Sequence, residues 1–343
     1  MTNSYTYHKN YNSVRIDIFV VPSSGRALIQ MSSDSADTAD GSIGTVLVVG
    51  ATGNQGGATV DHLLTADRDF TVCGLTRTPN SEAARALADR GVDVRRGNLN
   101  DQETLRPAVE GVDAVVIVTN IWTAGFDQSV RHGKNIADVA SNSGVNHIVF
   151  SGAGYHDRDL GVAALEPGGE VERYIRSLDV SATFVRPVWF MHNLEPAFED
   201  VLDGTLALPI EDGVPLQMID VDDVGRVIAR IVATPGEFAG EGFDLAGDEH
   251  TLAEMARILS EVTDADVDPF TAPIEEARKE MGEEMAELFQ WFNDKGYAVD
   301  IADLERRFGF EFTRFREYLE KNRWTDKNRP ARIPGLVKAL MQH

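Results

Sequence analysis

Three glycines have the spacing of a nucleotide-binding loop, in the run Gly50-Ala51-Thr52-Gly53-Asn54-Gln55-Gly56. The apolar segment 45–49 before them predicts a strand, and the segment after them has the pattern of a helix. A glycine loop in this context lets the backbone approach a pyrophosphate, and the helix start presents free N–H groups to its oxygens. The motif therefore predicts a dinucleotide site in a Rossmann domain.

The second expected strand ends in a basic residue. An NAD site usually places Asp or Glu roughly 20 residues beyond the glycines, where the carboxylate binds the ribose 2′-hydroxyl. This chain has Thr76-Arg77-Thr78 there, and a guanidinium suits the 2′-phosphate of NADP through paired charge-assisted hydrogen bonds. We expect NADP(H) in preference to NAD(H), with an exposed, solvated Arg77 as the alternative.

Polar residues also follow the third and fourth strands. Asn98 and Leu99 end the third strand, where a polar side chain can reach the adenine edge, although a plain turn is the alternative. The fourth strand is followed by the run Thr119-Asn120-Ile121-Trp122. Ligands bind at this carboxyl edge in doubly wound sheets, so we expect the run beside the nicotinamide ribose. Packing under a second lobe is the alternative for Trp122.

The residues suited to proton transfer are incomplete. Short-chain dehydrogenases use Tyr-x-x-x-Lys, in which the lysine lowers the tyrosine pKa so that it can act as general acid or base. From residue 44 onward no tyrosine has a lysine four residues later. Ser151 and Tyr155 follow the fifth strand and His192 lies across the expected cleft, so these three are the candidates for an unconventional proton donor, with polar cleft lining as the alternative.

Neither a metal site nor a disulfide is expected. His, Cys, Asp and Glu form no cluster with metal-ligand spacing. The single cysteine, Cys73, lies in the apolar run 71–75, so we expect it in the core of a protein from a reducing compartment.

Short β-branched runs alternate with amphipathic segments from residue 45, which predicts βαβ units and a parallel sheet. We expect strands at 45–49, 71–75, 92–95, 114–118, 147–150 and 182–186. Helices are expected between them at 57–65, 81–90, 102–109, 127–143 and 169–177. Farther along, helices at 221–234 and 251–262 flank the run 242–246, and one helix spans 273–292, in which Met281 and Met285 are interpreted as core residues.

The predicted fold class is α/β, a Rossmann doubly wound parallel sheet with a smaller, mostly C-terminal α/β lobe. The expected divisions are a flexible N-terminal tail at 1–43, the NADP-binding domain at 44–188, the smaller substrate or partner lobe at 189–324 with some segments returning to the sheet, and a basic tail at 325–343. The polar run before residue 43 cannot bury enough apolar surface to order itself. Met31 is an alternative start of translation to Met1.

The charge is strongly acidic, with 55 Asp and Glu against 32 Lys and Arg and a formal net charge of −23. Such a surface repels phosphates, so no direct nucleic-acid binding is expected. It stays hydrated in concentrated salt, which suggests a halophilic cytoplasm, with an ordinary acidic protein as the alternative. No apolar run approaches the ~20 residues of a membrane span and no signal peptide opens the chain, so we expect a cytoplasmic protein without a membrane partner.

At these residues the sequence resembles the NmrA-like family of atypical short-chain dehydrogenases, most closely its HSCARG-like branch of NADPH sensors. The resemblance spans roughly 45–324. It is carried by the glycine motif at 49–56, Thr76-Arg77, Val-Thr-Asn-Ile-Trp at 118–122, Gly133-Lys134, Val-Phe-Ser-Gly at 149–152, Glu-Val-Glu-Arg-Tyr-Ile at 170–175, Val185-Arg186-Pro187 and Asn193-Leu194. It implies that NADP is bound by 50–56, Arg77, 98–99, 119–121 and the segment Phe190-Met191-His192-Asn193.

Two positions depart from the family pattern. Gly168 stands where relatives place a lysine before Glu-Val-Glu, which removes an ammonium that the resemblance places at the nicotinamide ribose. A second basic residue shortly after Arg77 is also missing, because Asn80 and Ser81 stand there. Both departures weaken the affinity and the NADP preference that the resemblance implies.

Two functions remain open. The first is a redox-state sensor with weak or no dehydrogenase activity, in which NADP(H) occupancy changes a surface read by a regulatory protein partner. The second is a reductase of a quinone or another small planar carbonyl compound, with an aromatic-lined cleft from Trp122, Trp189, Phe190 and Met191. The missing Tyr-x-x-x-Lys disfavours a sugar-nucleotide epimerase. A homodimer is among the oligomeric states that the sequence leaves open.

Overall fold

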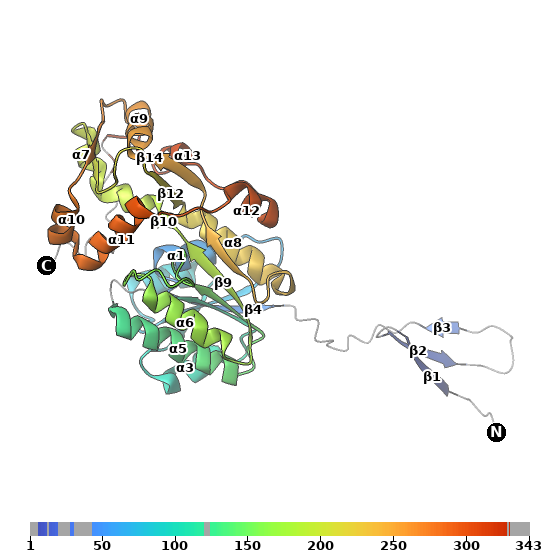
Figure 1. Ribbon diagram of the computed structural model, residues 1–343. Coiled ribbons are helices and arrows are strands. Elements are labelled where there is room, and N and C mark those ends of the chain that lie inside the picture. The colour runs from blue at the N-terminus through green and yellow to red at the C-terminus, as the bar shows by residue number, and fades with distance from the viewer. Residues whose placement is uncertain are drawn as a thin grey trace, which may run out of the picture. The chain divides into compact units, whose positions relative to one another are not determined.

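The computed structural model describes residues 6–11, 14–19, 28–30, 43–119, 124–327 and 329 of the chain. The chain divides into two units, residues 1–42 and 43–343. The first unit contains an antiparallel sheet of β1 (Thr6–Tyr11), β2 (Val14–Phe19) and β3 (Leu28–Gln30) (Figure 1). The sequence did not predict these strands, and Met31 with the polar run after it lies outside the described residues.

A parallel sheet of seven strands forms the centre of the second unit. Its spatial order is β13-β9-β8-β7-β4-β5-β6, and every neighbouring pair is parallel. The strands are β4 (Thr45–Val49), β5 (Thr71–Thr76), β6 (Asp93–Arg96), β7 (Ala114–Val118), β8 (His147–Ser151), β9 (Ser181–Pro187) and β13 (Gly242–Leu245). The order reverses between β4 and β7, where doubly wound folds bind their ligands. The predicted α/β fold class is confirmed, and the six predicted strands are β4 to β9.

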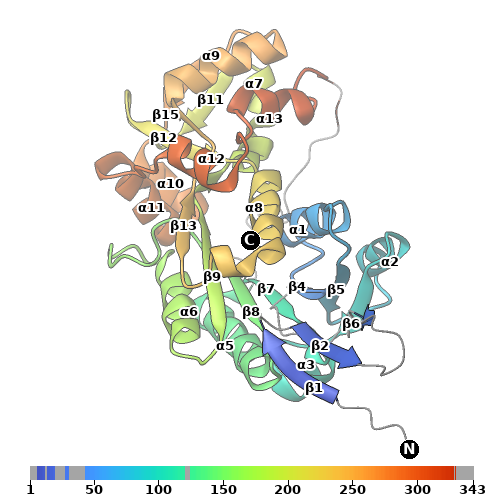
Figure 2. The same ribbon diagram turned by 90° about the vertical axis from the view of Figure 1, so that its right-hand side faces the viewer.

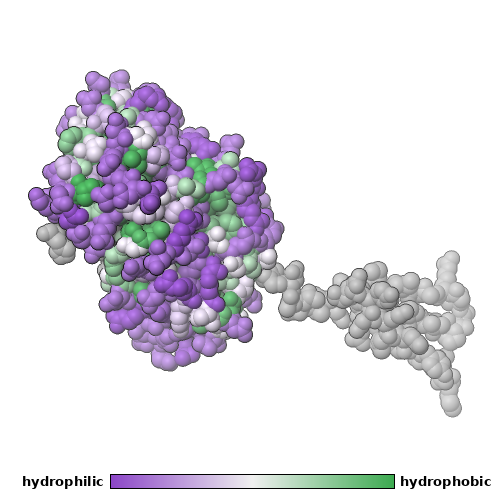
Figure 3. Space-filling view, in the orientation of Figure 1, coloured by the Kyte–Doolittle hydropathy of each residue, from purple (hydrophilic) through white to green (hydrophobic). Residues whose placement is uncertain are grey.

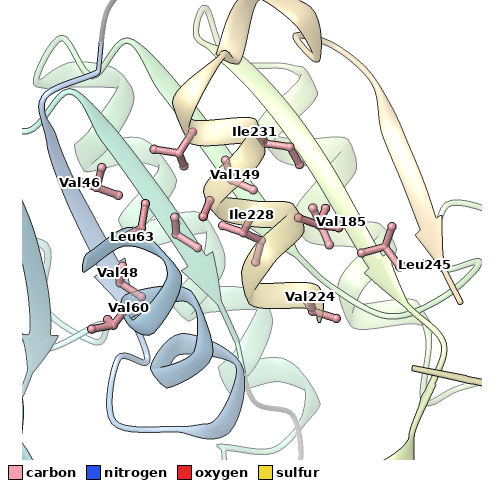
Figure 4. Close-up of a cluster of buried hydrophobic side chains, with 14 of the residues drawn as sticks. Val46, Val48, Val60, Leu63, Val149, Val185, Val224, Ile228, Ile231 and Leu245 are labelled. Atoms are coloured by element: carbon pink, nitrogen blue, oxygen red, sulfur yellow. The ribbon is translucent and has the colours of Figure 1, made fainter. Parts of the chain in front are cut away.

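Helices cover both faces of this sheet (Figures 1 and 2). On one face α1 (Asn54–Leu64) and α8 (Val221–Ala233) pack over buried valines of β4, β8 and β9, and Figure 4 shows this cluster. α2 (Glu82–Asp89) joins β5 to β6 on the same face. On the other face lie α3 (Gln102–Val109), α5 (Phe126–Asn142) and α6 (Glu166–Arg176). Burial from both sides explains why the central strands β4, β7 and β8 read as nearly continuous apolar runs instead of alternating patterns.

The chain leaves the large sheet after β9 and builds two small sheets, β10-β12-β14 and β11-β15, before and after its return as β13. These elements surround a separate core that contains Met255, Leu259, Phe289 and Phe315. The elements after β9, other than α8 and β13, are β10 (Trp189–Phe190), the 3-10 helices η1 (Met191–Ala197) and η2 (Pro235–Glu237), α7 (Phe198–Leu202), β11 (Thr205–Leu208), β12 (Pro215–Ile219), β14 (Asp248–Thr251), α9 (Leu252–Thr263), β15 (Asp268–Thr271), α10 (Ile274–Met281), α11 (Glu283–Asp294), α12 (Ile301–Phe308) and α13 (Phe315–Lys321).

One predicted helix is wrong. The segment 273–292 forms two helices, α10 and α11, because Gly282 between them has φ +92°, a conformation that ends a right-handed helix. Met281 and Met285 flank this break and pack against the core around Met255, as interpreted from their spacing. α6 begins at Glu166, earlier than predicted, since Pro167 is well suited to a first helical turn.

The C-terminal segment is not entirely peripheral, contrary to our expectation for 325–343. Arg329 is buried, and its Nη1 donates to Glu195 Oε2 at 2.8 Å. Its guanidinium also lies over the rings of Phe198 and Trp324. Residues 330–343 lie outside the described residues.

Cys73 is buried as expected, and burial raises its thiol pKa to about 11. Within the described parts of the chain, no helix has both the length and the apolar character needed to cross a membrane. The face of the second unit seen in Figure 3 is covered mainly by hydrophilic residues, in keeping with the acidic composition.

Candidate functional site

The glycine loop has the geometry that its spacing predicts. Gly50 has φ +77°, and its carbonyl oxygen accepts a hydrogen bond from the Gly53 N–H at 2.9 Å. A Cβ at Gly56 would overlap that same carbonyl oxygen, so only glycine fits where α1 meets the loop. Gly53 is the N-cap of α1 and no side chain caps it, so the first N–H groups of the helix have no side-chain acceptor among the described residues.

Side chains from three segments meet at the start of α1. The Ser151 hydroxyl, at the end of β8, donates to Gln55 Oε1 at 2.7 Å. Asn54 Nδ2 lies 3.4 Å from His192 Nε2, in the segment that follows β10. Ala51 is buried beneath the loop, whereas Thr52, Gly53 and Asn54 are exposed. The structure therefore brings two of the three proton-donor candidates, Ser151 and His192, to the glycine loop.

His192 is held in an apolar setting. Its ring stacks on Phe190 with 5.0 Å between centroids, and its buried Nδ1 has no hydrogen-bond partner among the described residues. Burial lowers the His192 pKa to about 4, against a smaller opposing effect of Glu195. The imidazole is therefore neutral near pH 7 and is a poor proton donor there.

Tyr155 is directed away from the glycine loop. It is buried in the second core, against Trp291 and Tyr297, and its hydroxyl oxygen accepts from the Ala298 N–H at 2.8 Å. Its backbone has φ +60°, and its N–H donates to Asp244. We therefore interpret Tyr155 as a packing residue and not as a proton donor.

The other predicted residues after β9 divide between core and surface. Trp189 and Met191 are buried in the second core, so their side chains do not line an open cleft, contrary to the aromatic lining expected of them. Phe190, His192 and Asn193 are half-buried. Thr119 is half-buried at the end of β7. Asn120, Ile121 and Trp122 lie outside the described residues.

Arg77 is exposed at the end of β5 and lines a cavity of about 680 Å³. Its charge contributes, after burial, to lowering the pKa of His132 on α5. Asn98 lies on the same cavity, although part of its hydrogen bonding is used in its own turn, where its Oδ1 accepts from the Asn100 N–H at 3.1 Å. The half-buried Leu99 follows, and its carbonyl oxygen accepts from Asn135.

Sequence reasoning missed two arginines of this cavity, Arg95 and Arg96. The sequence did contain an indication of these arginines. They stand at the end of the strand that follows β5 in the chain, and neighbouring parallel strands end at the same edge of a sheet. The register pairs Thr76 with Arg96. Register is a property of the folded sheet, however, and the spacing of residues in the sequence does not give it.

The space around Gly168 explains why a lysine is absent there. A Cβ at Gly168 would lie 2.5 Å from Nδ1 of His156, and one at Gly152 would overlap the same ring. The buried His156 ring accepts from the Ala153 N–H at 2.9 Å and donates from Nε2 to Glu172 at 2.6 Å. The two glycines therefore leave space for an imidazole ring, and no pattern in the sequence indicates this arrangement.

Glu172 connects His156 to a buried arginine. Arg186 donates to Glu172 Oε1 at 2.6 Å from the adjoining strand β9, and both side chains are almost fully buried. Burial opposes ionisation of this carboxyl, but hydrogen bonds from His156 and Arg186 outweigh it and hold its pKa at about 2. This cluster joins α6 to the sheet beneath the loop that follows β8.

The Tyr-x-x-x-Lys spacing occurs at Tyr5 and Lys9, in the unit of residues 1–42 and not in the unit that contains the glycine loop. Tyr5 lies outside the described residues. Within the described ranges, no group of three or more His, Cys, Asp and Glu side chains is arranged to hold a metal ion.

Comparisons agree with this architecture. A model of the NmrA-like family matches residues 42–324. An NmrA-like family domain-containing protein of Dictyostelium discoideum is 30% identical over 297 residues, which cover 80% of this chain and 97% of that protein.

Two solved structures share the fold. Triphenylmethane reductase from Citrobacter sp., complexed with NADP(H), matches with a TM-score of 0.70 and 24% identity, covering 80% of this chain and 99% of its own. NmrA, a negative transcriptional regulator, in complex with NADP, matches with a TM-score of 0.66 and 21% identity, covering 83% and 99%. With the family match over residues 42–324, these findings lead to one conclusion: the chain belongs to the NmrA-like family.

Proposed function

We propose that this protein binds NADP(H) across the carboxyl edge of the seven-stranded sheet. The observation that carries the proposal is an uncapped helix start behind a glycine loop, with the guanidinium of Arg77 exposed on a cavity one strand away. The loop fits a dinucleotide, because Gly56 lies against the Gly50 carbonyl without a side chain and the first N–H groups of α1 stay free for phosphate oxygens.

Different residues around the loop would hold different parts of the cofactor. The backbone of 50–56 would hold the pyrophosphate, Arg77 the 2′-phosphate, and Asn98 the adenine edge. Phe190, His192 and Asn193 border the opposite end, beside Asn54. When bound, the cofactor supplies hydride chemistry, and the protein supplies its orientation.

Within this proposal, we favour a sensor of NADP(H) occupancy with weak or no dehydrogenase activity, as in the HSCARG-like branch that the sequence resembles. The support lies in the proton donors. Tyr155 is committed to packing, the Ser151 hydroxyl donates to Gln55, and His192 is neutral near pH 7. A sensor needs a protein partner that discriminates the occupied from the empty state.

The second candidate is a reductase of a quinone or another small planar compound. It is favoured by the fold shared with triphenylmethane reductase complexed with NADP(H), whose name describes a reductase of triphenylmethane compounds. Planar acceptors reduced directly by hydride need little acid catalysis, so the positions of Ser151 and Tyr155 do not count against it.

Two measurements test these proposals. Calorimetric titration with NADP⁺, NADPH, NAD⁺ and NADH tests the cofactor, and the absence of binding by all four overturns the main proposal. Steady-state oxidation of NADPH with a panel of quinones and triphenylmethane dyes then separates the two functions. Turnover on the scale of about 1 s⁻¹ or faster favours the reductase. Binding of NADP(H) without turnover supports the sensor. A protein partner that binds the chain equally well with and without NADP(H) contradicts it.

The remaining proposals concern context. We propose a cytoplasmic location, with the acidic surface adapted to concentrated salt, and we retain the division into a nucleotide domain at 44–188 and a substrate or partner lobe at 189–324. A homodimer stays among the open alternatives, and sedimentation of the purified chain would decide its oligomeric state.

A further inference from the structure

The cavity beside Arg77 contains a second unpaired cation. Arg96, the last residue of β6, lines the same cavity of about 680 Å³. In the described residues, neither Arg77 nor Arg96 has a side-chain hydrogen bond or an ion pair. Other exposed arginines do pair with carboxylates, as Arg230 does with Glu237 at 2.8 Å and Arg307 with Glu241 at 2.8 Å.

The backbone fixes these two arginines at neighbouring strand ends. β5 and β6 pair in parallel with Thr76 opposite Arg96, and the next N–H, that of Gly97, donates to the Thr76 carbonyl at 3.0 Å. Figure 2 shows the two strands side by side near α2, with β6 as the edge strand of the sheet. A Cβ at Gly97 would lie 2.7 Å from Cδ1 of Leu75, so the glycine that follows Arg96 packs closely against the side chain of β5.

The third arginine of the cavity is already used. Arg95 Nε donates to Asp93 at 2.9 Å, and Arg95 Nη1 donates to the carbonyl oxygens of Ala108 and Glu110 near the end of α3. The Arg95 side chain is therefore held in place, whereas no described residue accepts a hydrogen bond from the Arg77 or Arg96 guanidinium. Two like charges held on one cavity repel each other, and an anion between them removes that cost.

We propose that Arg96 is the second arginine of the 2′-phosphate site and acts with Arg77 to select NADP over NAD. This inference rests on the proposed NADP(H) function and names a specificity residue that the strand pairing supplies. Asn80 and Ser81 provide no cation farther along the Arg77 loop, and Arg96 brings the missing charge from the adjacent strand. A phosphate dianion accepts from two guanidinium forks at once, whereas a 2′-hydroxyl has no charge to attract them.

Titration calorimetry with four probes tests the assignment: NADP⁺, NAD⁺, 2′,5′-ADP and 5′-AMP. Arg96→Ala should weaken NADP⁺ and 2′,5′-ADP by about 10- to 100-fold, the worth of hydrogen bonds to a charged group. Binding of NAD⁺ and 5′-AMP should stay unchanged. Arg96→Lys, which keeps the charge and loses the fork, should fall between wild type and Arg96→Ala.

A matched variant separates local from overall charge. Arg257 is exposed on α9 and pairs with Glu261, so Arg257→Ala makes the same change in net charge away from the cavity. Equal losses in Arg96→Ala and Arg257→Ala overturn the assignment, and so does a loss of NAD⁺ binding as large as that of NADP⁺. If wild type binds NADP⁺ but Arg96→Ala has no effect, only this inference fails. If wild type binds no dinucleotide, the proposed function fails as well.

Discussion

At the scale of single residues, two adjacent glycines of α1 have opposite tolerances. The position of Gly56 has no room for a side chain, because a Cβ would overlap the carbonyl oxygen of Gly50. A Cβ at Gly57 would make an ordinary contact, 3.7 Å from the Ala51 carbonyl oxygen. The two residues are chemically identical and one position apart, so together they test whether the loop must close onto the helix.

We predict that Gly56→Ala disrupts the loop and Gly57→Ala does not. Gly56→Ala should weaken NADP(H) binding at least about tenfold and cost about 1–3 kcal/mol of stability, as overpacking against backbone does. Gly57→Ala should bind normally and gain up to about 1 kcal/mol, because alanine has the higher helix propensity. Titration calorimetry and urea unfolding measure the two effects, and similar behaviour of both variants would contradict this account.

The sequence allows some of these residues to be predicted and hides others. The glycine loop and Arg77 follow from spacing, because their partners are the nearest strand and helix. Arg96 and the space for an imidazole ring at Gly168 require knowledge of strand register and of a loop returning onto α6. Tyr155 and Met191 were placed at the site because they follow strands, but their side chains turn into the second core. Position along the chain indicates an edge of the sheet and not the direction of a side chain.

At the scale of elements, close approach of helices depends on two glycines with different neighbours. Gly225 of α8 lies against α1, where a Cβ would be 2.5 Å from the carbonyl carbon of Ala58. Gly133 of α5 lies against α6, where a Cβ would be 2.7 Å from Cγ1 of Val171. Gly225 therefore meets backbone atoms, which no substitution can remove. Gly133 meets a side chain, so truncating that side chain can relieve the contact.

Gly225→Ala and Gly133→Ala should each cost about 1–3 kcal/mol, because each forces two packed helices apart. Val171→Ala should restore part of the loss in Gly133→Ala, since truncating that side chain opens the space that the new methyl needs. The same Val171→Ala change should not rescue Gly225→Ala, which makes it the control. Thermal unfolding of the five variants measures this, and purely additive effects of Gly133→Ala and Val171→Ala would refute the contact.

Element boundaries were predictable where local signals agree with burial. The predicted strands coincide with β4 to β9 within a residue or so, and for the central strands β4, β7 and β8 the reason is that two-sided burial gives uninterrupted apolar runs. The predicted helix at 273–292 failed at Gly282, where a single backbone angle outweighed a continuous helical pattern on both sides. A glycine within a helical pattern marks a break only where the folded chain changes direction, and the helical pattern alone does not show where the chain changes direction.

At the scale of the whole molecule, acid should weaken folding through buried histidines. His147 is the first residue of β8, and its ring contacts β9, where Nδ1 lies 2.9 Å from Ser181 Oγ and Nε2 lies 3.0 Å from Thr183 Oγ1. Because the Thr183 hydroxyl donates to the Phe238 carbonyl, Nε2 carries the proton and Nδ1 accepts. Burial lowers the His147 pKa from 6.5 to about 4, so the folded state resists protonation.

The direction of the change in stability with pH follows from the difference in bound protons between the folded and the unfolded state. Above about pH 6.5 the imidazole is neutral in both states and the stability is complete, whereas between about pH 6.5 and 4 the unfolded chain takes up the proton first and stability falls. The loss attributable to His147 is on the order of 2–3 kcal/mol. Urea unfolding from pH 7.5 to 4 measures it, and His147→Asn should flatten the slope. An unchanged slope would assign the acid sensitivity to other groups, with His192 the next to test.

The net charge of −23 makes the stability of the whole molecule depend on salt. Excess carboxylates repel one another most strongly in the folded state, and salt weakens that repulsion as the Debye length shrinks from about 10 Å at 0.1 M to about 3 Å at 1 M. We predict a melting temperature that rises by several degrees, on the order of 5–10 °C, between dilute buffer and molar KCl. Sucrose at matched osmolality is the control, because it stabilises by exclusion without screening charge. A gain in KCl well above that in sucrose supports adaptation to concentrated salt. Equal gains would identify an ordinary acidic protein, whose surface charge serves solubility alone.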